Sequence, residues 1–172
     1  MKIRNATIAE VPLIAEWRAE RAAWLASKGR DQWGSAGLHD TAFLERVTSS
    51  IKAGETWMIT KDSEPVGTIA IDQWSDPGLW SEDEMNDALF LHRLISPLSS
   101  SGHDIAGPLV NHALGLAAQQ QKHWLRLDAW TTNGALHQFW VRQGFEYLRT
   151  VPDVSSGALF QRPVYGSGCL EA

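Results

Sequence analysis

The sequence predicts an α/β fold. The main observation is an alternation of apolar, strand-like runs with helix-like periodicity across the stretch 87–145. Two apolar runs of strand length, 88–95 and 124–130, are each followed by a helical pattern, at 104–121 and at 133–142. Strands that alternate with helices in this way are typical of βαβ units, in which the two strands run parallel. A second observation, a hairpin signal upstream of this stretch, adds antiparallel strands to the expected sheet.

The N-terminal part of the chain predicts a strand, two helices and that hairpin. Residues 2–6 have the pattern of a short strand. Thr7 and Glu10 match a capping box, in which the two side chains satisfy free backbone donors at a helix start, and the helix should run to about Ser27. A glycine in the second hairpin strand, Gly67, indicates a bulge or a close approach of backbone. The other expected elements are a helix at 41–52, capped by Asp40, and strands at 57–60 and 65–72.

Two further regions complete the chain. Residues 73–86 are acidic and carry no regular apolar period, so we expect an irregular loop with its acidic side chains in solvent. Strands are expected at 146–151 and 158–162, joined by a turn. No repeat or interior linker is visible, which predicts a single domain over 1–163 and a loose tail at 164–172.

Composition excludes several classes of function. The 172 residues include 20 Asp and Glu against 15 Lys and Arg, a formal net charge of −5, which argues against a nucleic-acid partner and against an anionic membrane surface. No apolar run is long enough to cross a bilayer, and the first residues lack a signal-peptide pattern. The single cysteine, Cys169, excludes an intrachain disulfide and favours a cytoplasmic location. The spacing of the histidines predicts no metal site.

The order of strand, small-residue loop, helix, parallel strand and helix over 87–145 resembles the acyl-CoA-binding core of the GNAT acetyltransferase superfamily. The closest part of the match runs from Leu127-Asp-Ala-Trp-Thr-Thr-Asn133 to Gln143-Gly144-Phe145. The resemblance implies a mixed, mostly antiparallel central sheet of about seven strands flanked by about four helices. In that sheet the strands at about 87–95 and 124–130 would be parallel and splay apart. It also implies an acyltransferase domain and, because GNAT proteins are often dimers, a homodimer.

The resemblance assigns donor binding to the loop before the helix at 104–121. In GNAT proteins the backbone N–H groups of this loop and the following helix N-terminus face the pyrophosphate of CoA. The family pattern begins with Arg or Gln and has a glycine at its centre, whereas this chain has Ser101 and Asp104 at those positions. The usual cation is therefore missing, and a negative charge replaces a glycine. The matching positions are Gly102, His103, Asp104, Ile105, Ala106 and Gly107.

These departures leave three interpretations open. The donor is acetyl-CoA or another acyl-CoA, held mainly by its pantetheine arm, or it is an acyl group on the phosphopantetheine arm of an acyl carrier protein in a biosynthetic pathway. In the third interpretation the chain is a non-catalytic binding module with the GNAT fold. The pantetheine positions match the family: the backbone of Arg93, Leu94 and Ile95 would pair with the arm, and Asn133 would hydrogen-bond it. Asn133 can also act as a plain helix cap.

Direct acyl transfer to an amine needs a base, because a protonated amine has no lone pair. His92 lies on the strand where some family members carry a catalytic His or Glu, and imidazole suits proton transfer near neutral pH. A histidine with a structural hydrogen bond is the alternative. Asp72 and Asp128, at strand ends, are further candidates for the base. The position of the family's acidic tyrosine holds Trp140, whose indole N–H can stabilise a thiolate by hydrogen bonding but cannot deliver a proton at neutral pH.

The acceptor is expected to be the amine of a small molecule. In the family, the loop between the first two helices forms one wall of the acceptor pocket, which makes Gln32 and Trp33 candidate contacts. Trp33 could instead close the loop onto the core. Asp72, Trp74 and Asp128 are the other candidate acceptor contacts.

Overall fold

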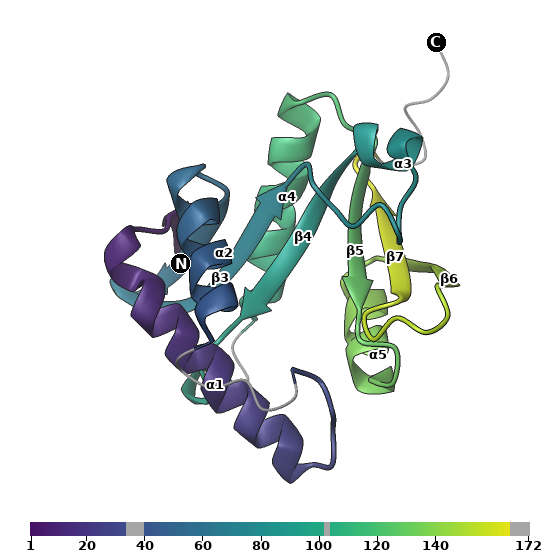
Figure 1. Cartoon of the computed structure of the whole chain (residues 1–172). Helices are drawn as coiled ribbons and strands as arrows, with labels where there is room; N and C mark the ends of the chain where they lie inside the picture. Colours follow the sequence, from purple (N-terminus) through teal and green to yellow (C-terminus); the bar gives the residue numbers. More distant parts are fainter. Residues whose placement is uncertain (34–39, 102–103, 166–172) are drawn as a thin grey trace. The chain divides into compact units, whose positions relative to one another are not determined.

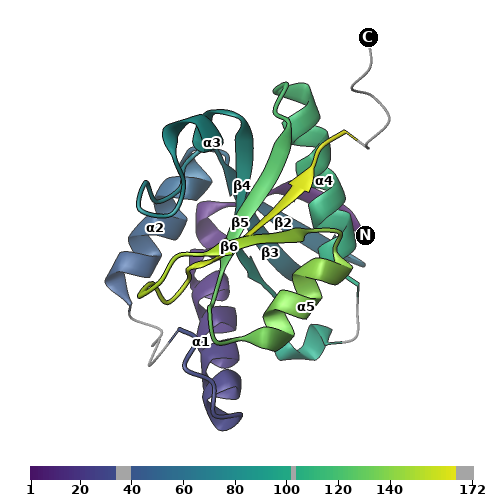
Figure 2. The same cartoon turned by 90° about the vertical axis from the view of Figure 1, so that its right-hand side faces the viewer.

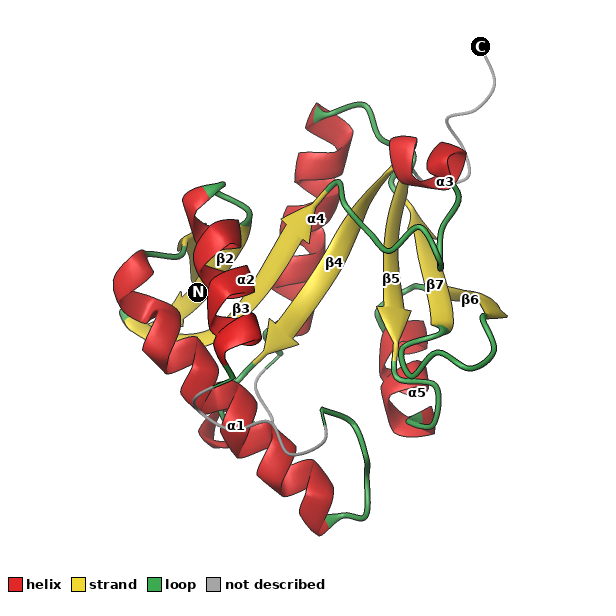
Figure 3. Cartoon of the chain, viewed as in Figure 1, coloured by secondary structure: helices red, strands yellow, loops and turns green. Residues whose placement is uncertain are grey.

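A computed structural model describes residues 1–33, 40–101 and 104–165 of the chain. These residues form seven strands and five α-helices, with short 3-10 helices at Ile8–Glu10 and Leu98–Ser100 (Figure 1; Figure 3). The strands make a mixed sheet in the order β1-β2-β3-β4-β5-β7-β6, which confirms the predicted fold class. The chain divides into two compact units. The first contains residues 1–70 and 93–105, and the second contains residues 71–92 and those from 106 onward.

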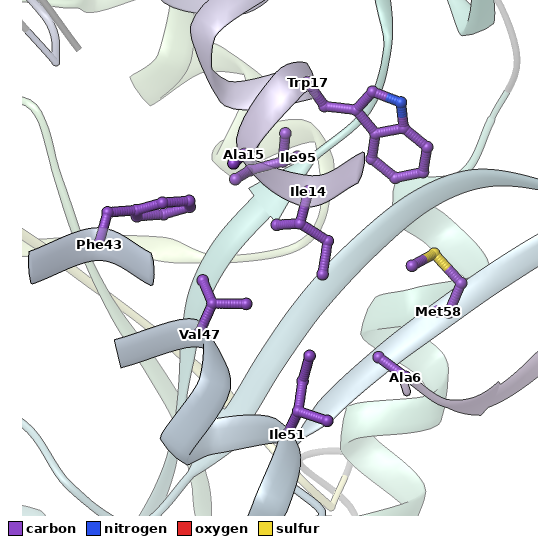
Figure 4. Close-up of a cluster of buried hydrophobic side chains, with 9 residues drawn as sticks. All are labelled: Ala6, Ile14, Ala15, Trp17, Phe43, Val47, Ile51, Met58 and Ile95. Carbon is purple, nitrogen blue, oxygen red and sulfur yellow. The ribbon is translucent and has the colours of Figure 1, made fainter. Parts of the chain in front are cut away.

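In the first unit, two helices pack on antiparallel strands. β2 (Thr56–Lys61) pairs with β1 (Lys2–Asn5) on one side and with β3 (Glu64–Asp72) on the other. α1 (Val11–Ser27) and α2 (Thr41–Lys52) supply most of a buried apolar cluster, and their side chains face one another and β2 (Figure 4). The cluster consists of Ala6, Ile14, Ala15, Trp17, Phe43, Val47, Ile51, Met58 and Ile95.

The local signals in this unit act largely as predicted. The capping box of Thr7 and Glu10 is present, but it closes a 3-10 turn, and α1 begins only at Val11. The carboxylate of Asp40 accepts the backbone N–H of Phe43 at 3.1 Å and caps α2. The pairing of β2 with β3 shifts register between Ile59, which lies opposite Gly67, and Thr60, which lies opposite Pro65, and this confirms the irregularity expected at that glycine.

The second unit holds the parallel strand pair and the C-terminal strands. β4 starts in this unit and runs parallel to β5, and β7 lies antiparallel between β5 and β6 (Figure 2). α4 packs against β5, and α5 packs against β6. The elements are β4 (Ala88–Ile95), α4 (Ala106–Gln119), β5 (Trp124–Ala129), α5 (Gly134–Arg142), β6 (Glu146–Thr150) and β7 (Ala158–Pro163).

The stretch 73–86 is not wholly irregular, contrary to expectation. It contains a short helix, α3 (Glu82–Asn86), which Ser81 and Glu84 cap reciprocally. Glu84 is also not a solvated loop residue, because its two oxygens accept hydrogen bonds from the Arg149 guanidinium at 2.7 and 2.8 Å. These hydrogen bonds lower the pKa of Glu84 to about 2. The expectation was wrong because the partner of Glu84 lies 65 residues further along the chain.

Candidate active site

The candidate active site lies in the second unit, where the pairing of β4 with β5 ends. Three residue pairs join the strands, and the last is Phe90 with Arg126. β5 continues to Ala129. His92 lies two residues beyond Phe90, on the same face of the strand, and the two rings stack with their centroids 6.3 Å apart. The side chain of His92 is 17% exposed, so it is mostly buried but reachable from solvent.

Two oxygen atoms bind the same nitrogen of His92. Nε2 lies 3.2 Å from Oδ1 of Asp72 and 3.0 Å from the carbonyl oxygen of Trp74. Asp72 is the last residue of β3, and its Oδ1 also accepts the backbone N–H of Trp74 at 3.0 Å, which forms an Asx turn. The turn after β3 therefore contacts the imidazole ring through both a side-chain oxygen and a backbone oxygen. Three of the predicted site residues meet here, although Trp74 does so through its backbone and its side chain is 68% exposed.

Asp128 on β5 is a second carboxyl group whose charge interacts with His92. Burial raises the pKa of Asp128. The positive charge of a protonated His92 and a hydrogen bond with the side chain of Ser156 oppose that effect, while the charge of Asp76 adds to it. The carboxyl group of Asp128 therefore accepts a proton more readily than an exposed aspartate does. Its interaction with Ser156 was not predicted, because that serine lies in the turn between β6 and β7.

The turn that carries Ser156 depends on Gly157. The Gly157 N–H donates to the carbonyl oxygen of Val154 at 3.0 Å, and the Gly157 carbonyl oxygen accepts the N–H of Val151 at 2.9 Å. A Cβ at this position would overlap the carbonyl oxygen of Val151 and lie 2.9 Å from that of Val154. Both clashes involve backbone atoms, so Gly157→Ala is expected to lower the free energy of unfolding by about 1–3 kcal/mol, measured by urea denaturation.

Gly115→Ala is the matched control for that substitution. Gly115 lies in α4, and a Cβ there meets no atom within 4 Å. Alanine at an exposed helix position should raise the free energy of unfolding by about 0.5–1 kcal/mol. Equal effects of the two substitutions would contradict the proposed tightness of the turn at Gly157.

α5 carries two predicted site residues, and the structure gives each a structural role. The side chain of Asn133 accepts the N–H of Leu136 at 3.2 Å and caps the helix, which confirms the capping interpretation and leaves its pantetheine contact a prediction. Trp140 is 6% exposed. Its ring makes edge contacts with those of Phe139 and Phe145, at 5.0 and 5.4 Å between centroids. Its predicted contact with a thiolate is untested by this geometry.

The remaining predicted residues lie in the first unit or near its end. Arg93 has a positive φ of 52°, which marks an irregularity in β4, and Ile95 is buried in the cluster of α1 and α2. Trp33 packs against that same cluster, which favours its structural interpretation. Of the other predicted site residues, Gln32 and Leu94 are half-buried and Asp104 is exposed. Ile105 and Ala106 are buried. Gly107, the second residue of α4, is half-buried, and Gly102 and His103 lie outside the described residues.

The sequence did not predict a set of hydrogen bonds that joins α1 to the loop after β4. The guanidinium of Arg21 donates to the carbonyl oxygens of Ser96 and Pro97, at 2.6 and 3.1 Å, and to the hydroxyl of Ser96 at 2.8 Å. Glu20 accepts the backbone N–H of Leu98 at 2.9 Å. Burial lowers the pKa of Arg21. The available signal was a charged residue inside the apolar stripe of α1.

The described part of the chain was searched for metal-binding clusters and for membrane-spanning helices. No group of three or more His, Cys, Asp and Glu side chains is placed to hold a metal ion there. The helices in the described ranges do not combine the length and the apolar character that crossing a bilayer requires.

Comparisons with known proteins show which proteins the chain is similar to in sequence and in fold. No protein-family model matches the chain. The chain is 28% identical over 178 residues to the uncharacterised N-acetyltransferase YesJ of Bacillus subtilis (strain 168), covering 95% of this chain and 96% of the relative. A GNAT-family acetyltransferase from Listeria monocytogenes 4b F2365 is similar in structure, with a TM-score of 0.75 and 23% identity over 94% of each chain. Aminoglycoside acetyltransferase AAC(6')-Ib in complex with coenzyme A and kanamycin is also similar, with a TM-score of 0.70 and 20% identity over 94% of each chain.

Proposed function

We propose that this chain belongs to the GNAT superfamily and that it is an N-acyltransferase, which moves an acetyl-type group from an acyl-CoA to the amine of a small molecule. The observation that carries the proposal is the position of His92 on β4, beside the end of the parallel pairing and held by Asp72 and the Trp74 carbonyl. A mostly buried imidazole at such a position can act as the base that direct transfer requires.

The chemistry assigned to the chain's residues is proton transfer. The acyl-CoA supplies an activated carbonyl carbon, with a thiolate as leaving group. An ammonium group loses two protons as it becomes an amide: His92 accepts one before the nitrogen attacks, and the other neutralises the departing thiolate as the C–S bond breaks. The indole N–H of Trp140 is proposed to stabilise that thiolate by hydrogen bonding, since it cannot deliver a proton at neutral pH.

A cationic acceptor fits the charges around His92. Asp72 and Asp128 place two carboxyl groups in the electrostatic surroundings of the imidazole. An opposite charge nearby favours the bound ammonium form of an amine until the base removes its proton. The structural relative AAC(6')-Ib binds kanamycin, a small molecule. We propose the same class of acceptor here, with the exposed Trp74 side chain as a further contact.

The donor site keeps some features that suit a phosphate and lacks others. α4 begins with the small residues Ala106 and Gly107, and it has no acidic side chain in its first turn that would repel an anion. Ser101 and Asp104 lack the positive charge that would strengthen the contact. We propose that a CoA donor is bound mainly through its pantetheine arm, with the backbone of Arg93, Leu94 and Ile95 as one predicted contact and the side chain of Asn133 as another. The missing charge is also the observation that favours the second candidate, a carrier-protein donor.

Calorimetric titration tests the donor. Acetyl-CoA is expected to bind with a Kd at least about tenfold lower than S-acetyl-phosphopantetheine, a difference of about 1.4 kcal/mol from contacts beyond the arm. Ser101→Arg should tighten only acetyl-CoA, because a charge-assisted contact to pyrophosphate is absent in the shorter compound. Equal affinities would move the carrier-protein donor to first place. If neither compound binds, the enzymatic proposal fails and a binding module takes its place.

A further inference from the structure

The hydrogen bonds of His92 limit where its protons can be. The carbonyl oxygen of Trp74 is only an acceptor, and an ionised Asp72 carboxylate is also only an acceptor. Both lie within hydrogen-bonding distance of the same ring nitrogen, at 3.0 and 3.2 Å. If Nε2 carried no hydrogen, its lone pair would face the lone pairs of both oxygen atoms, and the three atoms would repel one another. Nε2 must therefore carry a hydrogen in the neutral ring as well as in the protonated ring.

From this geometry we infer that Asp72 and the Trp74 carbonyl hold neutral His92 as the Nε2–H tautomer, so that Nδ1 is the atom that takes the proton from the acceptor amine. The inference rests on the proposed function of His92 and deepens it. Asp72 becomes a positioning residue instead of a base, because its Oδ1 already accepts the Trp74 N–H at 3.0 Å as well as the imidazole N–H. The backbone turn and the ring thus share one carboxylate oxygen.

The surrounding charges determine how the site responds to pH. The ionisable groups that interact with the imidazole include Asp72 at the end of β3 and Asp128 on β5, and the charge of Asp76, in the loop after β3, acts on Asp128. Asp72 is the one that also bonds the ring directly. Replacing it with asparagine keeps an oxygen acceptor for the imidazole and for the Trp74 N–H, and it removes one negative charge. A neighbouring anion favours the protonated ring, so Asp72→Asn should make the ring harder to protonate.

Nuclear magnetic resonance tests the tautomer without any need for activity. In protein labelled with nitrogen-15 on its histidine rings, the His92 signals are assigned by their loss in His92→Gln. Above the pH at which the ring titrates, Nε2 should show a pyrrole-type shift and Nδ1 a pyridine-type shift, both in the wild type and in Asp72→Asn. A pyridine-type Nε2 in the wild type, or rapid exchange between the two tautomers, would overturn the inference.

Kinetics tests the positioning role, with the best acceptor from a panel of primary amines that includes kanamycin. In Asp72→Asn, the acid limb of the kcat/KM profile should move to lower pH, while the plateau value stays within about tenfold of wild type. Asp76→Asn is the matched control: the charge that it removes acts on Asp128, and the Asp76 carboxylate accepts the Gly78 N–H, so the limb should move less and the tautomer should stay the same. A loss of more than about 10²-fold in kcat/KM at every pH in Asp72→Asn, with no movement of the acid limb, would instead make Asp72 the base.

The resonance experiment and the kinetic experiment together distinguish a failure of this inference from a failure of the proposed function. If no amine is acetylated but the Nε2–H tautomer is observed, the enzymatic proposal fails and the arrangement of His92 stands. If transfer occurs but the tautomer is the other one, the acyltransferase proposal stands and Nδ1 is not its base.

Discussion

Replacing His92 with glutamine is expected to lower kcat/KM for amine acetylation by about 10²–10⁴-fold, the usual contribution of a positioned general base. Glutamine is close to histidine in size and can still donate to Asp72 and to the Trp74 carbonyl through its amide group. It cannot accept a proton at neutral pH. The measurement is the initial rate of CoA release with saturating acetyl-CoA, across a range of pH. The acid limb that comes from the base should disappear, and only the rise caused by deprotonation of the free amine should remain.

His123→Gln is the control for that experiment. His123 also pairs with an aspartate, Asp87, through Nδ1 at 2.5 Å, but its side chain is 56% exposed and it lies at the start of β5. Its replacement should leave both the rate and the pH profile close to those of wild type. If His92→Gln keeps the wild-type pH profile with only a small loss of rate, the base is another group, and the buried carboxyl of Asp128 becomes the first alternative.

The strands and helices of the βαβα stretch could be predicted because their signals are local. The apolar runs at 88–95 and 124–130 correspond to β4 and β5, and Asn133 caps α5 as its position indicated. α3 was missed because a helix of five residues has no room for an apolar period. Its one local signal was the Ser81–Glu84 capping box, which lies within an acidic segment that resembles a solvated loop.

The sequence named candidate site residues, but it could not predict the contacts between them. His92 and Asp72 were candidates from their strand positions, yet the hydrogen bond between them joins residues 20 positions apart and depends on tertiary placement. The oxygen of Trp74 that meets the ring is a backbone atom, which no side-chain pattern reveals. Trp33 and Trp140 look alike in the sequence as pocket residues, whereas the structure packs one against the core of the first unit and buries the other among phenylalanines.

Trp80 links α3 to the C-terminal strands of the second unit. Its side chain is 1% exposed, and its ring meets Phe90 of β4 edge-on at 5.5 Å between centroids. Two guanidinium groups lie over the indole, those of Arg126 and Arg149, at 5.4 and 5.3 Å. Cations over an indole face are attracted by the negative face of the ring. Burial lowers the pKa of Arg126. The ring therefore contributes both apolar packing and partial compensation for two positive charges.

Trp80→Ala is expected to lower the free energy of unfolding by about 3–5 kcal/mol, because it removes the largest fully buried side chain among the described residues and leaves a cavity. Trp80→Phe should cost clearly less. It keeps an aromatic face for the arginines, and among the described residues the buried indole N–H has no hydrogen-bond partner to lose. Urea denaturation followed by circular dichroism gives both values, with Trp24→Ala as the control. Trp24 is 43% exposed on α1, and its loss should change stability by about 0.5 kcal/mol at most. If Trp80→Ala costs no more than Trp24→Ala, α3 is not held to the strands through this ring. The Glu84–Arg149 pair, 2.7 Å between Oε1 and Nη1, would then be the main attachment of the helix.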